Sequence, residues 1–262
     1  NNSGLKANFN LTSGKNIVNY GIDLNLHQLS PKSYRPASDS SLVILNESEQ
    51  ERALEGAVCI DNKIFLTDFL FLNVGVRMSS FFSFGPKTVY GYDAGFSKSN
   101  STIVDTVAFS SGNVIARYGG PEFRGSLNFK VSENHSIKLN YNRTRQYIHL
   151  LSNTTSISPT DTWKLCDSHL KPEIGDQYAV GFYKLMFGKR IETSAEVYGK
   201  TIRNMVDYKG GTALTTADHI EQTIINTRGK AYGVEISLKK QEGRVHYSLG
   251  YTYSRTFLRR DR

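Results

Sequence analysis

Apolar and polar residues alternate along much of the chain, and this period of two constrains the fold more than any other feature. Between Gly243 and Phe257, the odd positions from Val245 to Tyr253 are aliphatic or tyrosine, and the even positions are His, Ser, Gly or Thr. Successive side chains of a strand point to opposite faces, so this segment is predicted to be a strand with one apolar and one polar face. The same alternation recurs from Leu5 onward and predicts about ten antiparallel strands.

The joins between these strands alternate between short turns and long connections, as they do in up-and-down outer-membrane barrels. The strands are also long, at about ten to eighteen residues, whereas globular strands have about five or six and a tilted membrane-spanning strand needs about nine to eleven. The sequence therefore predicts an all-β fold, an antiparallel up-and-down transmembrane β-barrel segment. The short turns are expected near Ser13 and at Asp61–Lys63, Ser132–Asn134, Gly188–Lys189 and Gln241–Glu242, and the long connections at about 29–50, 85–118, 151–175 and 209–223.

Each strand presents one face that suits hydrocarbon and one that suits water. In a membrane barrel the apolar face contacts lipid and the polar face lines the lumen. The residues predicted to face lipid are Leu70, Leu72, Val74, Leu127, Phe129, Val180, Phe182, Ile236, Leu238, Tyr247, Leu249 and Tyr251. The residues predicted to face the lumen are Arg124, Lys138, Glu192, Glu196, Lys200 and Glu235.

The charge of the chain does not point to nucleic acid. The formal net charge is +8, but Lys and Arg are scattered singly along the strands and form no basic cluster with interleaved aromatics. No window of about 18 apolar residues is present, so no transmembrane helix is encoded. We therefore expect outer-membrane lipid as a partner and no nucleic acid.

The sequence carries no pattern for catalysis, a metal or a cofactor. The six histidines include no pair at helical spacing and no Cys/His cluster, and Ser110-Ser111-Gly112 lacks the context of a nucleophile elbow. Cys59 and Cys166 could form one disulfide in an oxidising compartment, but no spacing pattern supports pairing, so we expect both to be unpaired. We predict that the chain is not an enzyme and has no catalytic residue, metal site or cofactor.

The long connections are the expected place for ligand contacts, because loops on a rigid scaffold commonly carry recognition. The single tryptophan, Trp163, lies in one of them, and an exposed Trp can stack on a sugar or an aromatic chelate. The alternative for each such residue is a packing or solvated role in the loop. The residues predicted to contact a ligand are Trp163, Tyr90, Tyr92, Arg117, Tyr118 and His219.

Four successive motifs in the last third of the chain resemble one family. Leu170–Glu173, followed by Asp176–Tyr183, resembles the "LKPE--D-YE-G" segment that opens a late barrel strand of TonB-dependent outer-membrane receptors. Residues 192–208 resemble the "A-YYK-I-N-V-Y" strand that follows it in the family, 226–235 the "N-G-A-GVE" strand and 251–256 the "YTYS-T" strand. The motifs occur in order and at hairpin spacing over roughly 170–262, whereas upstream the resemblance rests on the alternation alone.

This resemblance implies a barrel of about twenty-two strands with an N-terminal plug, in the outer membrane of a Gram-negative bacterium. Such receptors take up iron chelates, cobalamin or glycans with force from the inner membrane. The implied partners are the plug, an energy-coupling inner-membrane protein and a nutrient ligand, and a surface lipoprotein that caps the barrel is a further one. The chain has about ten strands, no plug and a charged end at Arg259–Arg262, so residues 1–262 are expected to be an internal barrel segment.

Two other functions stay open at this point. A soluble all-β module that binds carbohydrate would use the tyrosines as platforms, and a passive porin would share the barrel without energised uptake. The odd positions from Val245 to Tyr253 separate these classes, because they face lipid in a receptor or porin and a protein core in a soluble module.

Overall fold

The computed structural model describes residues 2–30, 33–34, 38, 46–47, 50–151, 162–188, 190–208 and 219–260. Ten strands form one antiparallel sheet in the order β1-β2-β5-β6-β9-β10-β13-β14-β15-β16, which confirms the predicted fold class. Each strand pairs with the next long strand along the chain, so the sheet is a simple up-and-down wall. The strands are β1 (Asn2–Ser13), β2 (Asn16–Leu29), β5 (Glu51–Phe65), β6 (Leu70–Phe84), β9 (Val114–Ser132), β10 (His135–Gln146), β13 (Glu173–Met186), β14 (Ile191–Tyr208), β15 (Ile224–Lys240) and β16 (Tyr247–Arg260).

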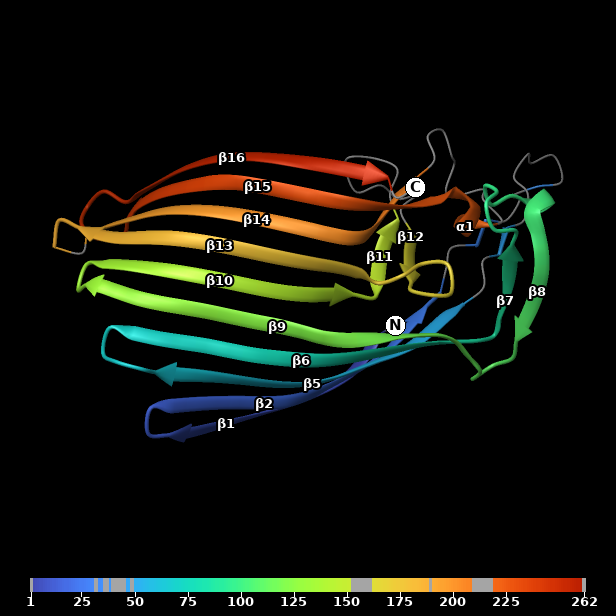
Figure 1. Cartoon of the computed structure of the whole chain (residues 1–262), viewed down its shortest axis with the longest axis horizontal. Helices are drawn as coiled ribbons and strands as arrows, with labels where there is room; N and C mark the ends of the chain where they lie inside the picture. Colours follow the sequence, from blue (N-terminus) through green and yellow to red (C-terminus); the bar gives the residue numbers. More distant parts are fainter. Residues whose placement is uncertain are drawn as a thin grey trace.

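The short turns gather at one end of the wall, and the long connections gather at the other, as Figure 1 shows. The long connections carry small elements of their own, which the sequence analysis did not predict. Three two-stranded hairpins, one turn of α-helix and one turn of 3-10 helix lie in these connections. They are β3 (Ser33–Tyr34) with β4 (Asn46–Glu47), β7 (Lys87–Tyr92) with β8 (Ile103–Phe109), β11 (Ile148–Leu151) with β12 (Thr162–Leu165), α1 (Ile220–Thr223) and η1 (Asn100–Thr102).

One of the predicted turns is misplaced, and another belongs to a longer join than predicted. Residues 61–63 do not turn, because β5 continues to Phe65 and Asn62 pairs with Val74 across the ladder. The chain reverses instead at 66–69, where the Phe69 amide donates to the Thr67 hydroxyl at 3.3 Å. The last join is also longer than predicted, since β16 begins at Tyr247 and Gly243 breaks the extended backbone with a φ of +96°.

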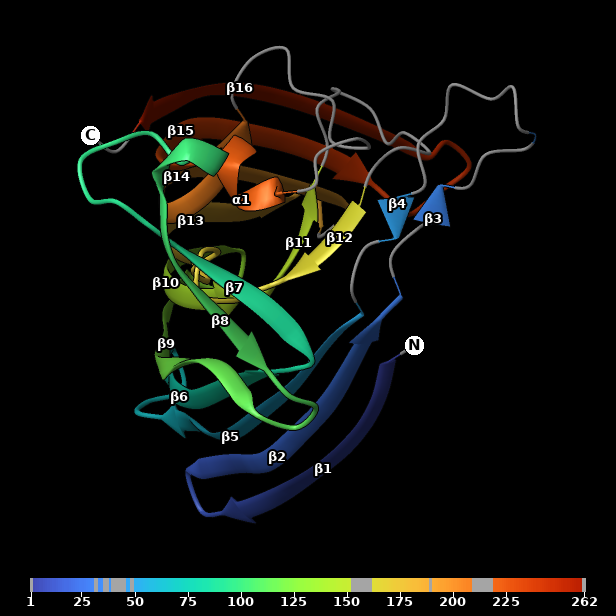
Figure 2. The same ribbon diagram turned by 90° about the vertical axis from the view of Figure 1, so that its right-hand side faces the viewer.

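The wall is curved, and the hairpin β11–β12 lies inside the curve (Figure 2). The only buried apolar cluster among the described residues sits between this hairpin and the wall, where Phe81 of β6 stacks on Tyr147 with ring centroids 4.9 Å apart. Ala53 of β5 and Leu165 of β12 complete the contact. The concave face of each strand is therefore the face that carries Phe81 on β6 and its ladder partners on the other strands.

The pairing register of the strands shows on which face of the sheet each predicted lipid-facing or lumen-facing residue lies. All twelve residues predicted to face lipid lie on the convex face, and all six predicted to face the lumen lie on the concave face. Val74 is 43% exposed, Ile236 45% and Leu249 64%, so these side chains do not share a dry centre within the described chain. The contact of the convex face with lipid remains a prediction.

Candidate functional site

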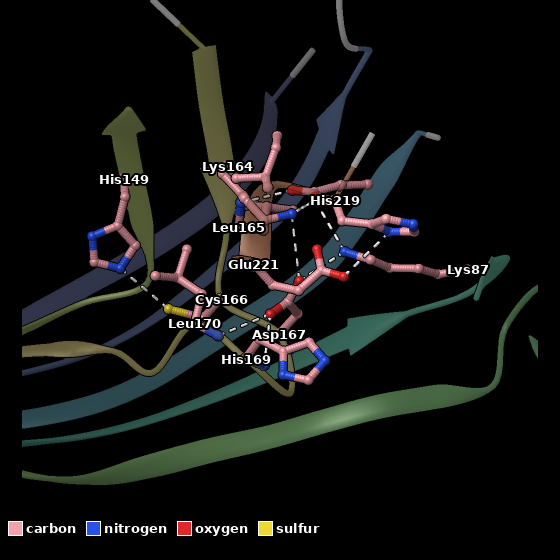
Figure 3. A network of polar contacts seen from close by, with 12 residues as sticks. Lys87, His149, Lys164, Leu165, Cys166, Asp167, His169, Leu170, His219 and Glu221 are labelled. Carbon is pink, nitrogen blue, oxygen red and sulfur yellow. Dashed lines mark hydrogen bonds and ion pairs between the residues drawn. The ribbon is translucent and has the colours of Figure 1, made fainter. Parts of the chain in front are cut away.

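Four buried charged residues tie the hairpin β11–β12 to the wall, and we call Glu51, Lys87, Lys164 and Asp167 the loop network. Lys164 Nζ lies 2.5 Å from Glu51 Oε1, and Lys87 Nζ lies 3.2 Å from the same oxygen and 2.7 Å from Asp167 Oδ2. Figure 3 shows Lys87 approaching Lys164 and Asp167 from a different segment of the chain. None of the four side chains is more than 19% exposed, so the network holds two positive and two negative charges away from water.

Mutual pairing keeps these groups charged despite their burial. Burial alone would raise the pKa of Asp167, but Lys164 and Lys87 outweigh it and hold that pKa well below its usual range. Burial would likewise lower the pKa of Lys164, and Glu51 and Asp167 raise it instead. Removal of one partner of such a buried set leaves an uncompensated charge, which typically costs about 3–5 kcal/mol.

Hydrogen bonds fix the backbone that follows β12. The Glu51 carboxylate also accepts from the Leu165 amide at 2.8 Å, and the Tyr118 hydroxyl donates to the Asp167 carbonyl at 2.7 Å. Asp167 Oδ1 accepts from the amides of His169 and Leu170, both at 2.9 Å, in a local turn typical of Asp. The segment from β12 to Leu170 is therefore anchored to β5, β7 and β9 at once.

Cys166 and His149 form a buried pair within this anchor. Cys166 Sγ lies 3.4 Å from His149 Nε2 (Figure 3). Burial lowers the pKa of His149 to about 4, so the imidazole is neutral at pH 7, and burial raises the pKa of the Cys166 thiol. A neutral thiol beside a neutral imidazole is a poor nucleophile, so the pair is structural. Cys59 and Cys166 are both free, as predicted.

A second group of side chains lies where three long connections meet, and we call Tyr90, Tyr92, Lys98, His169, His219 and Glu221 the loop cluster. The rings of Tyr90 and His219 meet edge to face, with centroids 4.7 Å apart, and those of Tyr92 and His169 lie 5.7 Å apart. Lys98 Nζ sits 5.7 Å above the Tyr92 ring. The members come from β7 and its following loop, from the segment after β12, and from the start of α1.

The electrostatics of the loop cluster are nearly balanced. The Tyr92 hydroxyl donates to Glu221 Oε1 at 2.9 Å, and burial, helped by Glu221, raises the pKa of Tyr92 to about 12. Burial and then Lys98 lower the pKa of His169, whose Nδ1 lies 3.2 Å from Lys98 Nζ. The cluster therefore combines aromatic rings with one cation and one carboxylate. No group of three or more His, Cys, Asp or Glu with the geometry for a metal ion occurs in the part of the chain that the structure describes.

The structure brings together some of the predicted ligand-contact residues and separates others. Tyr90, Tyr92 and His219 belong to the loop cluster, whereas Tyr118 bonds to Asp167 of the loop network. Trp163 lies on β12 with an exposed side chain.

Arg117 is not part of the cluster, because it lies on the convex face of β9 with its guanidinium 5.4 Å above the Phe82 ring. The sequence analysis missed Lys98 and Glu221, and it missed the loop network altogether. The spacing of charged residues along the sequence does not reveal which residues of two separate long connections form an ion pair.

A curved antiparallel wall of long strands, with short turns at one end and structured loops at the other, defines the class of outer-membrane β-barrel proteins. Within the described residues, no helix is long and apolar enough to cross a membrane. The family described as "TonB dependent receptor-like, beta-barrel" matches residues 1–262, and the chain therefore belongs to it. This confirms the resemblance and the outer-membrane location in a Gram-negative bacterium, and the family is one of transporters rather than enzymes, as predicted.

Solved structures show the same fold at low sequence identity. The FrpB iron transporter from Neisseria meningitidis in its apoprotein form is 12% identical with a TM-score of 0.63, and it is matched over 98% of this chain and 36% of its own. The ferric-catecholate import receptor Fiu from E. coli K12 in its closed form is 15% identical with a TM-score of 0.59, and the match covers 98% of this chain and 38% of Fiu.

A copper transporter, OprC, is 13% identical with a TM-score of 0.63, and the match covers 97% of this chain and 38% of OprC. The chain thus spans little more than a third of these structures. No curated protein matches it.

Proposed function

We propose that this chain forms part of the barrel wall of a receptor for energised nutrient uptake, and that the loop cluster contacts the nutrient. The observation that carries the proposal is the convergence of three connections that are far apart in sequence on one group of rings and charges. Gln222 of α1 bonds Asn100 at 2.7 Å across more than a hundred residues of chain. Loops held together in this way form a pre-organised recognition surface on a rigid scaffold.

An anionic aromatic iron chelate is the ligand that the chemistry of the loop cluster favours. The rings of Tyr90, Tyr92 and His219 can stack on or meet the edges of aromatic groups, and Lys98 supplies a positive charge. The chain is also basic, with a formal net charge of +8, which attracts anions over longer range. The structural similarity to FrpB, an iron transporter, and to Fiu, a ferric-catecholate import receptor, supports a ferric catecholate as the first ligand to test.

A glycan is the second candidate, and one observation favours it. The Trp163 side chain is 53% exposed although it lies on a hairpin whose next residue, Lys164, is buried. A large exposed indole held on a rigid strand is a good platform for the apolar face of a sugar.

The remaining parts of the receptor are proposed from the family. We infer that the 1–262 segment contributes part of the wall and the loops that extend from it, and that some of the charged concave residues contact a plug in the full-length protein. On this face Lys138 Nζ lies 4.4 Å from the Tyr183 ring centroid and the Tyr183 hydroxyl donates to Glu196, so these groups are oriented within the curve. A soluble module is not supported, because its exposed Leu249, Tyr251 and Val180 would form an apolar surface prone to aggregation.

The test uses the full-length receptor in detergent, titrated with a ferric catecholate, cobalamin and a linear glucan. Lys98→Gln removes the cation of the loop cluster, and we expect the affinity for the ferric catecholate to fall about tenfold, since a cation over aromatic rings contributes about 1 kcal/mol or more. Lys15→Gln, in the turn at the opposite end of the wall, is the matched control and should leave the affinity unchanged. Unaltered ferric catecholate binding by Lys98→Gln would contradict the assignment, and tight glucan binding lost in Trp163→Ala would favour the second candidate.

A further inference from the structure

The convex face of β10 and β13–β15 is ordered in rows that run across the strands. The ladder places Leu139, Val180, Val197 and Val234 opposite one another in a single row. Two residues closer to the long-loop end, the next row contains Tyr141, Tyr178, Gly199 and Tyr232. The rings of Tyr141 and Tyr178 are 4.9 Å apart. An aliphatic band is therefore followed by a line of tyrosines, which is the order found at a membrane interface.

The row beyond the tyrosines contains three charged residues. They are Arg143 on β10, Asp176 on β13 and Lys230 on β15, and the other members of the row are Thr201 on β14 and Phe257 on β16. Arg203 projects from the same face two residues further along β14. On β16, Arg255 is aligned with Tyr232 and Arg259 lies further toward the loops. Five basic residues on four strands thus lie beside or above the tyrosine line on the convex side.

Asp176 is the one acidic residue in these rows, and two arginines already hold it. Arg143 Nε lies 2.6 Å from Asp176 Oδ1, and Arg203 Nη2 lies 3.4 Å from Oδ2. The Tyr141 hydroxyl donates to the same carboxylate at 2.8 Å. Asp176 fixes the two guanidinium groups but neutralises only one of the positive charges. Lys230 and Arg255 are exposed and form no ion pair with any residue that the structure describes.

The position of this basic row relative to a bilayer follows from strand geometry. From Tyr232 to Lys240 the strand β15 rises ~27 Å at ~3.4 Å per residue, or ~21 Å along the membrane normal for a tilt of ~40°, which is close to the ~25 Å apolar band of outer-membrane barrels. If the Tyr232 row marks one edge of that band, the next row lies at the level of lipid headgroups. Arginine guanidinium groups there match phosphate in charge and geometry.

We propose that the convex basic row, Arg143, Arg203, Lys230, Arg255 and Arg259, binds the phosphate groups of anionic lipids in the membrane leaflet on the long-loop side. The site is separate from the loop cluster, since it lies on the outside of the wall and contacts no residue of that cluster in the described chain. Lipid phosphates held along the rim anchor the height of the wall in the bilayer. The proposal rests on the convex face contacting lipid and is independent of the nutrient.

The experiment measures lipid retained by the full-length receptor in a neutral detergent, by native mass spectrometry during titration with lipid A that carries two phosphates. The variant combines Arg203→Gln, Lys230→Gln and Arg255→Gln. Because one basic side chain near an anionic membrane surface contributes about a fivefold factor, the triple variant should bind this lipid at least about tenfold more weakly.

A matched variant removes the same charge from the concave face through Lys138→Gln, Lys200→Gln and Lys239→Gln, and its lipid affinity should change by less than about twofold. Heat-modifiable mobility on a gel shows whether each variant retains its barrel. An equal loss in both triple variants overturns the proposal, as does equal retention of lipid A from which the phosphates have been removed. Displacement of the lipid by millimolar inorganic phosphate also overturns it, because the site would then be one for soluble anions.

Discussion

Two ionic networks line the concave side of the wall, and they differ in what they hold together. The loop network joins β5, β7 and β12 with the segment after it, and these elements share no backbone ladder. The wall network, His27, Glu55, Arg77 and Glu122, joins neighbouring strands that are already hydrogen-bonded, with Arg77 2.7 Å from Glu122 and 3.1 Å from Glu55. The same chemistry therefore sets the position of a loop in one place and adds to an existing sheet in the other.

This difference predicts that the loop network controls local order at the long-loop end. In Lys164→Met two buried carboxylates lose their main cation, so the free energy of opening of the hairpin β11–β12 should fall by about 3–5 kcal/mol. Hydrogen exchange of the amides of 148–151 and 162–167 in the full-length receptor measures this opening. Lys171→Met, an exposed change in the same connection, is the control. Unchanged protection in Lys164→Met would show that packing of Phe81 and Tyr147 alone holds the hairpin.

The opening of the hairpin β11–β12 should also depend on pH, because His149 is buried in its closed state. Its pKa is lowered to about 4 when the hairpin is closed, against 6.5 when it is free. Below pH 6.5 the open state binds a proton that the closed state does not, so stability present above pH 6.5 is lost as the pH falls toward 4, by up to about 3 kcal/mol.

The measurement compares hydrogen exchange of residues 148–151 in the unaltered receptor and in His149→Gln between pH 7 and pH 4, with rates corrected for intrinsic exchange. The difference between the two proteins isolates the histidine from carboxylates that titrate in the same range. A slope that persists unchanged in His149→Gln would assign the pH dependence to other groups, such as His169, whose pKa burial also lowers.

The strands and their faces could be predicted because period-two alternation is local and the ladder preserves it. The same rule explains why Arg117 is separated from the other predicted ligand contacts. Since β9 begins at Val114 rather than near Tyr118, alternation already places Arg117 on the convex face. The turn predicted at Asp61–Lys63 has residues typical of turns, but its pairing with β6 overrides that local preference.

The loop network and most of the loop cluster could not be predicted, because their partners are distant in sequence. Glu51 and Lys164 are 113 residues apart, and Lys87 and Asp167 are 80 apart. A single sequence contains no information on which distant charges pair, and folding selects these pairs only when the wall has brought the loops to one end. Tyr90, Tyr92 and His219 were found by their chemistry, which does not depend on a partner.

The wall network supplies the smallest expected effect. In Arg77→Met, Glu122 loses its ion-pair partner, whereas Glu55 keeps its contact with His27. The backbone of residue 77 remains paired with Cys59 on β5 and Glu122 on β9. The expected loss is about 1–2 kcal/mol, the penalty for one poorly satisfied charged group. Protection of the β6 amides should fall by this amount, while protection of residues 148–167 stays unchanged. Arg124→Met, on the same concave face, is the control. If Arg77→Met also releases the hairpin β11–β12, the two networks are coupled through Phe81 and Tyr147. The wall network would then help to position a loop, and the difference between the two networks would not hold.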